Sequence, residues 1–264
     1  MNTVMYSEIR GEGFVFDHKI IECATPDDFP PHIHTNCELL FFIRGNVSYR
    51  IEGRSYKLKK GDLVFSRPSV FHNIFPEDGT LYERYNIIYD EELLPNEIKE
   101  RIPQGVDVFS FGDNPKIFDL FEKLDSYKEY FSANTVSRLA SHIIEELFCN
   151  LAITNDFSQG ESLINPLIGK ALSYIDENLT TVKNIDEICQ SLYITKSHLH
   201  HLFIEYIRVS PKKYITSKRL LLARKLIKYG KKPTEAAIAA GFDDYATFYR
   251  NYKKSFGFTP SEQN

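Results

Sequence analysis

TEAAIAAGFDDYATFYRNYKKSFGFTP, residues Thr234–Pro260, is the stretch that decides the fold, and it predicts a short helix, a tight turn and a second helix. Gly241 marks the turn because glycine adopts a positive φ without steric cost. Asp244 can cap the second helix by accepting from a backbone N–H of its first turn. Phe248 and Tyr252 share one face at i, i+4, which leaves the polar side chains on another. This plan is either an ordinary corner between helices or a helix-turn-helix unit that places its second helix in the major groove of DNA.

The same plan occurs once more upstream, at residues 185–206. Thr195 is placed like Asp244, as the cap of a second helix, and Phe203 is placed like Tyr252. A capped helix of about 19 residues joins the two units and spans roughly 28 Å at 1.5 Å per residue. Successive major-groove faces lie roughly 34 Å apart on one side of B-DNA. The spacing therefore predicts two helices that reach adjacent segments of the groove. If the joining helix falls slightly short, the DNA must bend or one helix must bind loosely.

Residues 167–260 resemble the DNA-binding domain of the AraC/XylS family of transcription regulators. The resemblance is carried by YIDENL, IDEICQSLYITKSHLHHLF, the joining helix SPKKYITSKRLLLARKLI and AAIAAGFDDYATFYRNYKKSFGFTP. It implies a domain of seven helices with two helix-turn-helix motifs. The sequence departs from the family at Arg208, where glycine is usual, and after Pro260, where only a stub of the last helix is expected.

By position, the resemblance implies that eight side chains meet DNA. They are Lys196, Ser197, His200 and His201 in the first unit, and Tyr245, Ala246, Thr247 and Arg250 in the second. Arg250 is the strongest candidate for base reading, because arginine can donate two hydrogen bonds to guanine O6 and N7. The alternatives are a phosphate or intradomain contact for Arg250 and a passive surface role for the histidines.

Charge is distributed unevenly along the 264 residues. Residues 165–264 carry 16 Lys and Arg against 9 Asp and Glu, a net charge of +7. The preceding residues carry 16 against 27, a net charge of −11. This asymmetry favours a polyanionic partner for the C-terminal part alone, and a mixed solvated surface is the alternative.

The N-terminal part predicts a different class of fold. Residues 1 to about 110 show short alternating or apolar runs separated by turns, such as Leu39–Ile43 and Val47–Ile51, which are typical of an all-β barrel or double-sheet jelly roll. Residues 115–154 change to helical spacing and predict a pair of helices. These helices either form a dimer contact or cover the open face of the barrel.

Three histidines and a glutamate in this part resemble the two motifs of the cupin barrel. His32 opens a His-x-His-x3-Glu sequence, and His72 closes a second motif that departs from the pattern because no glycine follows Pro68. These groups could ligate Fe, Mn, Ni or Zn, but regulators of the resembled family often keep similar histidines while binding organic ligands without metal. We expect a ligand pocket with no metal and no cofactor, and a metal site or structural histidines are the alternatives. The predicted pocket residues are His32, His34, Glu38, Tyr49 and His72.

The chain as a whole predicts a multidomain α+β protein. A cupin-like effector-binding and dimerisation domain (residues 1–154) and a polar linker (155–164) precede an all-α DNA-binding domain (165–264) with two helix-turn-helix motifs. Scattered cysteines without a C-x-x-C pair, no secretory leader and no long apolar run indicate a cytoplasmic protein with reduced thiols and no membrane role.

The expected function is that of a sequence-specific DNA-binding transcription regulator, without enzyme activity, that responds to a small polar metabolite such as a sugar. The resemblance favours an activator whose partners are double-stranded promoter DNA, the effector, RNA polymerase and a second copy of the chain. Two alternatives remain: a metal-dependent cupin enzyme fused to a DNA-binding tail, and a DNA-binding protein whose barrel only dimerises.

Overall fold

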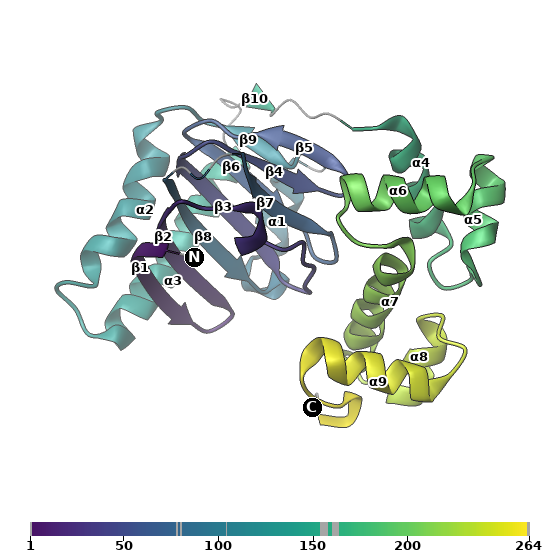
Figure 1. Cartoon of the computed structure of the whole chain (residues 1–264). Coiled ribbons are helices and arrows are strands. Elements are labelled where there is room, and N and C mark those ends of the chain that lie inside the picture. Colours follow the sequence, from purple (N-terminus) through teal and green to yellow (C-terminus); the bar gives the residue numbers. More distant parts are fainter. Residues whose placement is uncertain are drawn as a thin grey trace. The chain divides into compact units, whose positions relative to one another are not determined.

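The computed structural model describes residues 2–77, 79, 81–103, 105–153, 158–159 and 164–262, and the chain forms two compact units (Figure 1). Unit 1 comprises Met1–His32, Asn36–Ile51 and Ser55–Leu163; unit 2 comprises Ile33–Thr35, Glu52–Arg54 and Ile164–Asn264. The predicted linker, residues 155–164, lies almost entirely outside the described residues. Its Ser158–Gln159 forms the short strand β10.

Unit 1 is built on two antiparallel sheets, which confirms the predicted β-rich N-terminal half. A seven-stranded sheet has the order β1-β2-β8-β3-β6-β9-β10, and a three-stranded sheet has the order β5-β4-β7. The strands are β1 (Asn2–Gly11), β2 (Phe14–Glu22), β3 (Cys37–Arg44), β4 (Val47–Ile51), β5 (Arg54–Lys57), β6 (Asp62–Ser66), β7 (His72–Pro76), β8 (Tyr82–Tyr89) and β9 (Val108–Ser110). Buried residues of both sheets, such as Leu40, Val64 and Tyr49, share one apolar core, so the sheets pack face to face.

Three helices contribute to a second apolar core on the other face of the larger sheet. They are α1 (Asn96–Arg101), α2 (Pro115–Tyr127) and α3 (Ala133–Ile153). Phe121 of α2 stacks on Phe41 of β3 with ring centroids 4.6 Å apart, and Phe148 of α3 packs edge-on against Phe65 of β6. The apolar residues that suggested a dimer seam therefore cover the sheet of their own chain, and a dimer would use the exposed sides of these helices.

His18 ties β2 to α2 inside this packing. Its Nδ1 lies 2.5 Å from Asp125 Oδ2, and its Nε2 lies 3.0 Å from Glu83 Oε1. Burial by itself lowers the pKa of His18, but the hydrogen bonds and charges of Asp125 and Glu83 outweigh it and raise that pKa. The ring therefore holds a helix and a strand together through charge-assisted hydrogen bonds.

Unit 2 is helical, as predicted. Its elements are α4 (Pro166–Glu177), α5 (Ile185–Leu192), α6 (Lys196–Tyr206), α7 (Pro211–Lys228), α8 (Pro233–Ala239), α9 (Tyr245–Phe256) and the 3₁₀ turn η3 (Pro260–Glu262). The expected seventh helix is thus only the short turn η3. Within the described parts of the chain, no helix combines the length and apolar composition that crossing a bilayer requires.

Side-chain caps start the helices where the sequence placed them. Asn165 accepts from Leu167 N at 2.9 Å, and Asn184 accepts from Glu187 N at 3.2 Å. Thr195 caps α6 through His198 N at 3.2 Å, Ser210 caps α7 through Lys213 N at 3.3 Å, and Asp244 caps α9 through Thr247 N at 2.7 Å. Each cap satisfies an N–H group that would otherwise lack an intrahelical partner.

The two helix-turn-helix units use the same turn. In the first, Tyr193 has φ +55° and Ile194 N donates to Cys189 O at 3.0 Å. In the second, Gly241 has φ +89° and Phe242 N donates to Ala237 O at 3.0 Å. This left-handed residue with a six-to-one hydrogen bond is the Schellman ending of a helix. The second turn is one residue longer before its cap, which explains why the repeat is inexact.

Helix α7 connects the two helix-turn-helix units (Figure 1), and its side chains contribute to the core of each. Tyr214 near its start packs edge-on against Phe203 of α6 with ring centroids 5.4 Å apart. Leu220, Ala223 and Ile227 farther along are buried with residues of α8 and α9. The 18 residues of α7 give a rod of about 27 Å at 1.5 Å per residue, close to the predicted length.

A second contact joins the two helix-turn-helix units of unit 2 directly. A Cβ built on Gly241 would lie 2.6 Å from Thr180 O and 3.0 Å from Arg219 Nε. Arg219 of α7 donates to Leu179 O at 2.8 Å and to Val182 O at 2.6 Å. The turn at Gly241 in the second helix-turn-helix unit therefore packs against the loop that precedes α5 in the first helix-turn-helix unit. The Arg219 side chain of α7 lies between them.

We expect Gly241→Ala to destabilise the protein by more than Gly230→Ala. Both glycines have a φ near +90°, but a Cβ at Gly230 meets no atom within 4 Å. Gly230→Ala should therefore cost only the backbone strain, about 1–2 kcal/mol, whereas Gly241→Ala adds the clash with Thr180. Chemical unfolding of both variants measures the difference, and equal losses would contradict the proposed packing.

Candidate functional site

The eight side chains predicted to meet DNA are all exposed, on α6 and α9. On each helix the apolar residues four and eight positions after the cap are buried: Leu199 and Phe203 in α6, Phe248 and Tyr252 in α9. The exposed residues occupy the remaining face, so each second helix presents polar groups to solvent while its aromatic anchors hold it in the core. This is the arrangement by which a helix-turn-helix unit offers its second helix to a groove.

The start of α6 borders an open groove of about 740 Å³. Its lining residues are Asn184, Ile185, Asp186, Lys196, Ser197, His200, Ser210, Pro211 and Lys212. The N-termini of α5, α6 and α7 all meet this groove, and helix N-termini favour anions. Lys196 Nζ lies 2.8 Å from Asp186 Oδ1, a contact that raises the pKa of Lys196, so phosphate binding there would compete with an existing ion pair.

The start of α9 is organised around Asp244. Hydrogen bonds from the Thr247 side chain and backbone hold the pKa of Asp244 below its usual value, so the cap is an anion. Arg250 Nη2 donates to Thr247 Oγ1 at 3.3 Å. This contact orients an exposed guanidinium next to the first turn of the helix, where side chains of a recognition helix reach base edges.

Arg208, the departure from the family pattern, keeps the backbone conformation that glycine normally supplies. Its φ is +64°, in the left-handed region. A side chain in that region costs roughly 1–2 kcal/mol. The turn after α6 is therefore preserved, and the substitution appears as local strain and not as a changed path of the chain.

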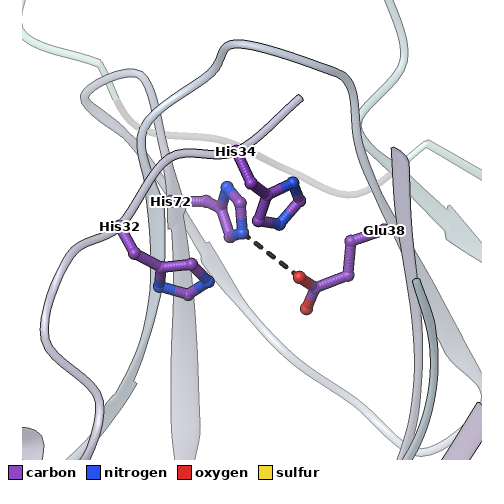
Figure 2. Close-up of side chains that lie close together, drawn as sticks. All are labelled: His32, His34, Glu38 and His72. Atoms are coloured by element: carbon purple, nitrogen blue, oxygen red, sulfur yellow. Dashed lines mark hydrogen bonds and ion pairs between the residues drawn. The ribbon is translucent and has the colours of Figure 1, made fainter. Parts of the chain in front are cut away.

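Four of the five predicted pocket residues come together in the part of the chain that the structure describes. His32, His34, Glu38 and His72 each offer one ligand atom, and these atoms all lie within 4.8 Å of one another. Figure 2 shows the three imidazoles and the carboxylate pointing toward one another, with His72 Nε2 at 3.3 Å from Glu38 Oε2. Glu38 and His72 are buried, whereas His32 is exposed. The cluster thus runs from the surface into the interior.

Tyr49 and Asn86 surround the buried half of the cluster. The Tyr49 ring stacks parallel to His72 with centroids 6.1 Å apart, and its hydroxyl lies 3.1 Å from Ser66 Oγ. Burial, helped by the charge of Glu38, raises the pKa of Tyr49, so the hydroxyl stays protonated. The Asn86 amide nitrogen, in the orientation that satisfies its neighbours, donates to Glu38 Oε1 at 3.2 Å.

Asn86 and the buried pair of Asp17 on β2 and Arg84 on β8 were not predicted from the sequence. Arg84 forms a buried ion pair with Asp17, and their strands pair beside each other. Arg84 Nε and the Tyr82 hydroxyl are buried atoms without a hydrogen bond among the described residues. Strand alternation places Tyr82, Arg84 and Asn86 on one face of β8, but no local pattern indicates that this polar face is buried.

A small cavity of about 110 Å³ lies on the opposite face of β3 from Glu38, because neighbouring residues of a strand point to opposite sides. It is lined by Cys37, Phe65, Arg67, Pro68, Tyr89, Glu91, Leu94, Lys99 and Ile102. None of these residues was predicted to line a pocket. Arg67 donates to Pro103 O, Val106 O and Asp107, so its guanidinium is engaged in the wall.

Family models match both units. The model of an AraC-like ligand binding domain matches residues 19–127, and the model of a helix-turn-helix domain matches residues 188–263. Together with the β-sheet unit and the doubled helix-turn-helix, these matches define a DNA-binding transcription regulator with a ligand-binding domain. The chain belongs to the AraC family.

Several curated relatives align over nearly the whole chain. The transcriptional activator RhaS of Escherichia fergusonii is 20% identical over 89% of this chain and 87% of its own. The virulence regulon transcriptional activator VirF of Yersinia enterocolitica is 23% identical over 92% of this chain and 93% of its own. The lactose operon transcription activator of Staphylococcus xylosus is 29% identical over a shorter part, 40% of this chain and 38% of its own.

One solved structure of similar extent is that of ToxT from Vibrio cholerae with bound unsaturated fatty acid. It covers 98% of this chain and 96% of its own at 13% identity, with a TM-score of 0.38. A score this low supports no argument about the site.

Proposed function

We propose that the protein is a sequence-specific transcription activator that binds promoter DNA through α6 and α9 and responds to a small polar metabolite in unit 1. The observation that carries the proposal is the doubled helix-turn-helix with eight exposed polar or small side chains on its two second helices. The net charge of +7 over residues 165–264 supports a polyanionic partner. Activation is supported by the relatives, three of which are named as transcription activators.

Within this proposal, the start of α6 contacts phosphate, and later residues of α6 together with the first turns of α9 contact bases. Lys196 and the groove at the start of α6 suit phosphate, because three helix N-termini meet there. Ser197, His200 and His201 follow on α6, and Tyr245, Ala246, Thr247 and Arg250 open α9. Arg250 suits guanine best, because its fork can donate to O6 and N7 at once.

We expect Arg250→Ala to weaken binding to a specific duplex by about 1–3 kcal/mol and to relax base preference at one position. The duplex is obtained by selection from a random library with the unmodified protein, and affinity is measured at several salt concentrations. Arg250→Lys keeps the charge but not the fork, so it should lose the base preference while retaining most of the salt dependence.

Lys170→Ala is the matched control, because it removes one exposed positive charge from α4 of the same unit. Its effect should be small and equal on specific and random DNA. If Arg250→Ala also lowers affinity equally for specific and random duplexes, Arg250 contacts phosphate only and its base-reading role is wrong.

The effector proposal rests on the polar interior of unit 1. His72, Glu38, Asn86 and Arg84 are all at most 7% exposed, on strands that otherwise contribute to apolar cores. Buried polar groups are retained where they have partners, and the atoms of Arg84 and Tyr82 without a protein hydrogen bond favour a polar ligand. A sugar is the proposed class, and one relative is named as the activator of a lactose operon.

The true effector should raise the melting temperature of the purified protein in a panel of sugars and other polar metabolites, since a ligand that binds only the folded state stabilises it. Tyr49→Phe, which removes one hydroxyl from the proposed pocket, should reduce the shift. The absence of any shift across the panel would favour the alternative in which unit 1 only dimerises.

The proposal also covers the roles of the domains, the protein partners and the cellular location. We propose that residues 1–154 bind the effector and dimerise through exposed sides of α2 and α3, that residues 155–164 link the domains, and that residues 165–264 bind DNA. RNA polymerase is the proposed partner at the promoter. The cytoplasm is the proposed location, because bacterial relatives named as activators act on operons.

A further inference from the structure

We propose that His32, His34, Glu38 and His72 bind one divalent transition-metal ion. This revises the expectation of a metal-free pocket, and it rests on the geometry of these four side chains and not on the DNA-binding function. Three imidazole nitrogens and one carboxylate oxygen form a donor set suited to Zn, Fe, Mn or Ni, and the cluster contains no thiolate that would select a softer ion.

The distances between the ligand atoms approach those of a coordination sphere. Ligand atoms about 2.1 Å from one ion at tetrahedral or octahedral angles lie roughly 3.0–3.4 Å from each other. His72 Nε2 and Glu38 Oε2 are 3.3 Å apart, and all four ligand atoms lie within 4.8 Å of one another. Small side-chain rotations therefore bring four ligand atoms onto a common centre.

Hydrogen bonds to backbone carbonyls set the histidine tautomers. His72 Nδ1 lies 3.0 Å from Val70 O, and His32 Nδ1 lies 3.2 Å from Pro30 O. A carbonyl oxygen only accepts, so Nδ1 carries the proton in both rings, and in the neutral ring Nε2 carries the lone pair. Metal-binding histidines are oriented in this way, by donation from the nitrogen that does not bind the ion.

The backbone also holds the cluster in place. His32 N donates to His72 O and His72 N donates to His32 O, each at 3.1 Å, so the His32 segment is pinned to the start of β7. His34 lies between His32 and Glu38 in the chain and is tethered on both sides. Glu38 stands on β3 of the larger sheet, where Asn86 of β8 donates to its other oxygen. A bound ion would therefore bridge the two sheets.

Exposure gives the ion a route to the site. The cluster passes from exposed His32 through half-buried His34 to buried Glu38 and His72. A divalent ion entering by this route would meet the Glu38 carboxylate at the buried end of the cluster.

The test is metal analysis of the full chain purified without a histidine tag. The protein is stripped with EDTA, loaded separately with Zn²⁺, Mn²⁺, Fe²⁺ or Ni²⁺, dialysed, and measured by mass spectrometry of the elements. We expect about one ion per chain for at least one metal, and a rise in melting temperature of about 5 °C or more at roughly 100-fold excess over Kd.

Three variants separate this site from nonspecific binding. His34→Ala and Glu38→Gln should each lose the bound ion and the thermal shift, while their melting temperatures in EDTA show that they fold. His142→Ala is the matched control and should retain both, because His142 is 79% exposed on α3. Fewer than about 0.1 ions per chain with every metal, or equal retention by all three variants, would overturn the proposal. Neither result bears on DNA affinity, which is measured separately.

Discussion

The contact between Gly241, Arg219 and the loop before α5 is the constraint on which unit 2 depends. Helix α7 alone would keep the two helix-turn-helix units a fixed distance apart, but a single helix leaves the rotation of each unit to its own local packing. Arg219 donates from α7 to Leu179 O and Val182 O, and Gly241 fits against Thr180. The loop of one unit and the turn of the other therefore share one packed junction, which fixes the direction of both second helices.

The charge and hydrogen bonds of the partly buried Arg219 stabilise this junction. Burial lowers the pKa of Arg219, yet a guanidinium remains charged at any physiological pH. Its charge-assisted hydrogen bonds to two carbonyls satisfy groups that a helix connection would otherwise leave to water. These hydrogen bonds offset the cost of burying the guanidinium, and Lys183 adds an exposed ion pair to Asp243 at 3.0 Å across the same junction.

The sequence predicted the elements better than their long-range contacts. The caps at Thr195 and Asp244 and the strand at Val47–Ile51 follow from local signals, and the structure confirms them. The packing of Gly241 on Thr180 and the approach of Asn86 to Glu38 join distant segments, so no local pattern reveals them. The same holds for α3, whose apolar spacing fits a dimer seam and a sheet-covering face equally well.

Some residues of the candidate sites could be predicted from the sequence, and others could not. Position within the family motif placed all eight proposed DNA-contacting residues on α6 and α9, where the structure shows them exposed. The histidine cluster was found because His32, His34 and Glu38 are neighbours in the chain. The buried polar face of β8 was not predicted, because the burial of Arg84 and Asn86 depends on contacts with distant segments.

Hydroxyl-radical footprinting of the full chain on a selected duplex tests most directly whether the two helix-turn-helix units act as one rigid DNA-reading body. We expect two protected segments on one side of the duplex, one helical turn or about 10–10.5 base pairs apart. A single protected segment, or two segments whose spacing varies among selected sequences, would contradict a fixed junction between the units.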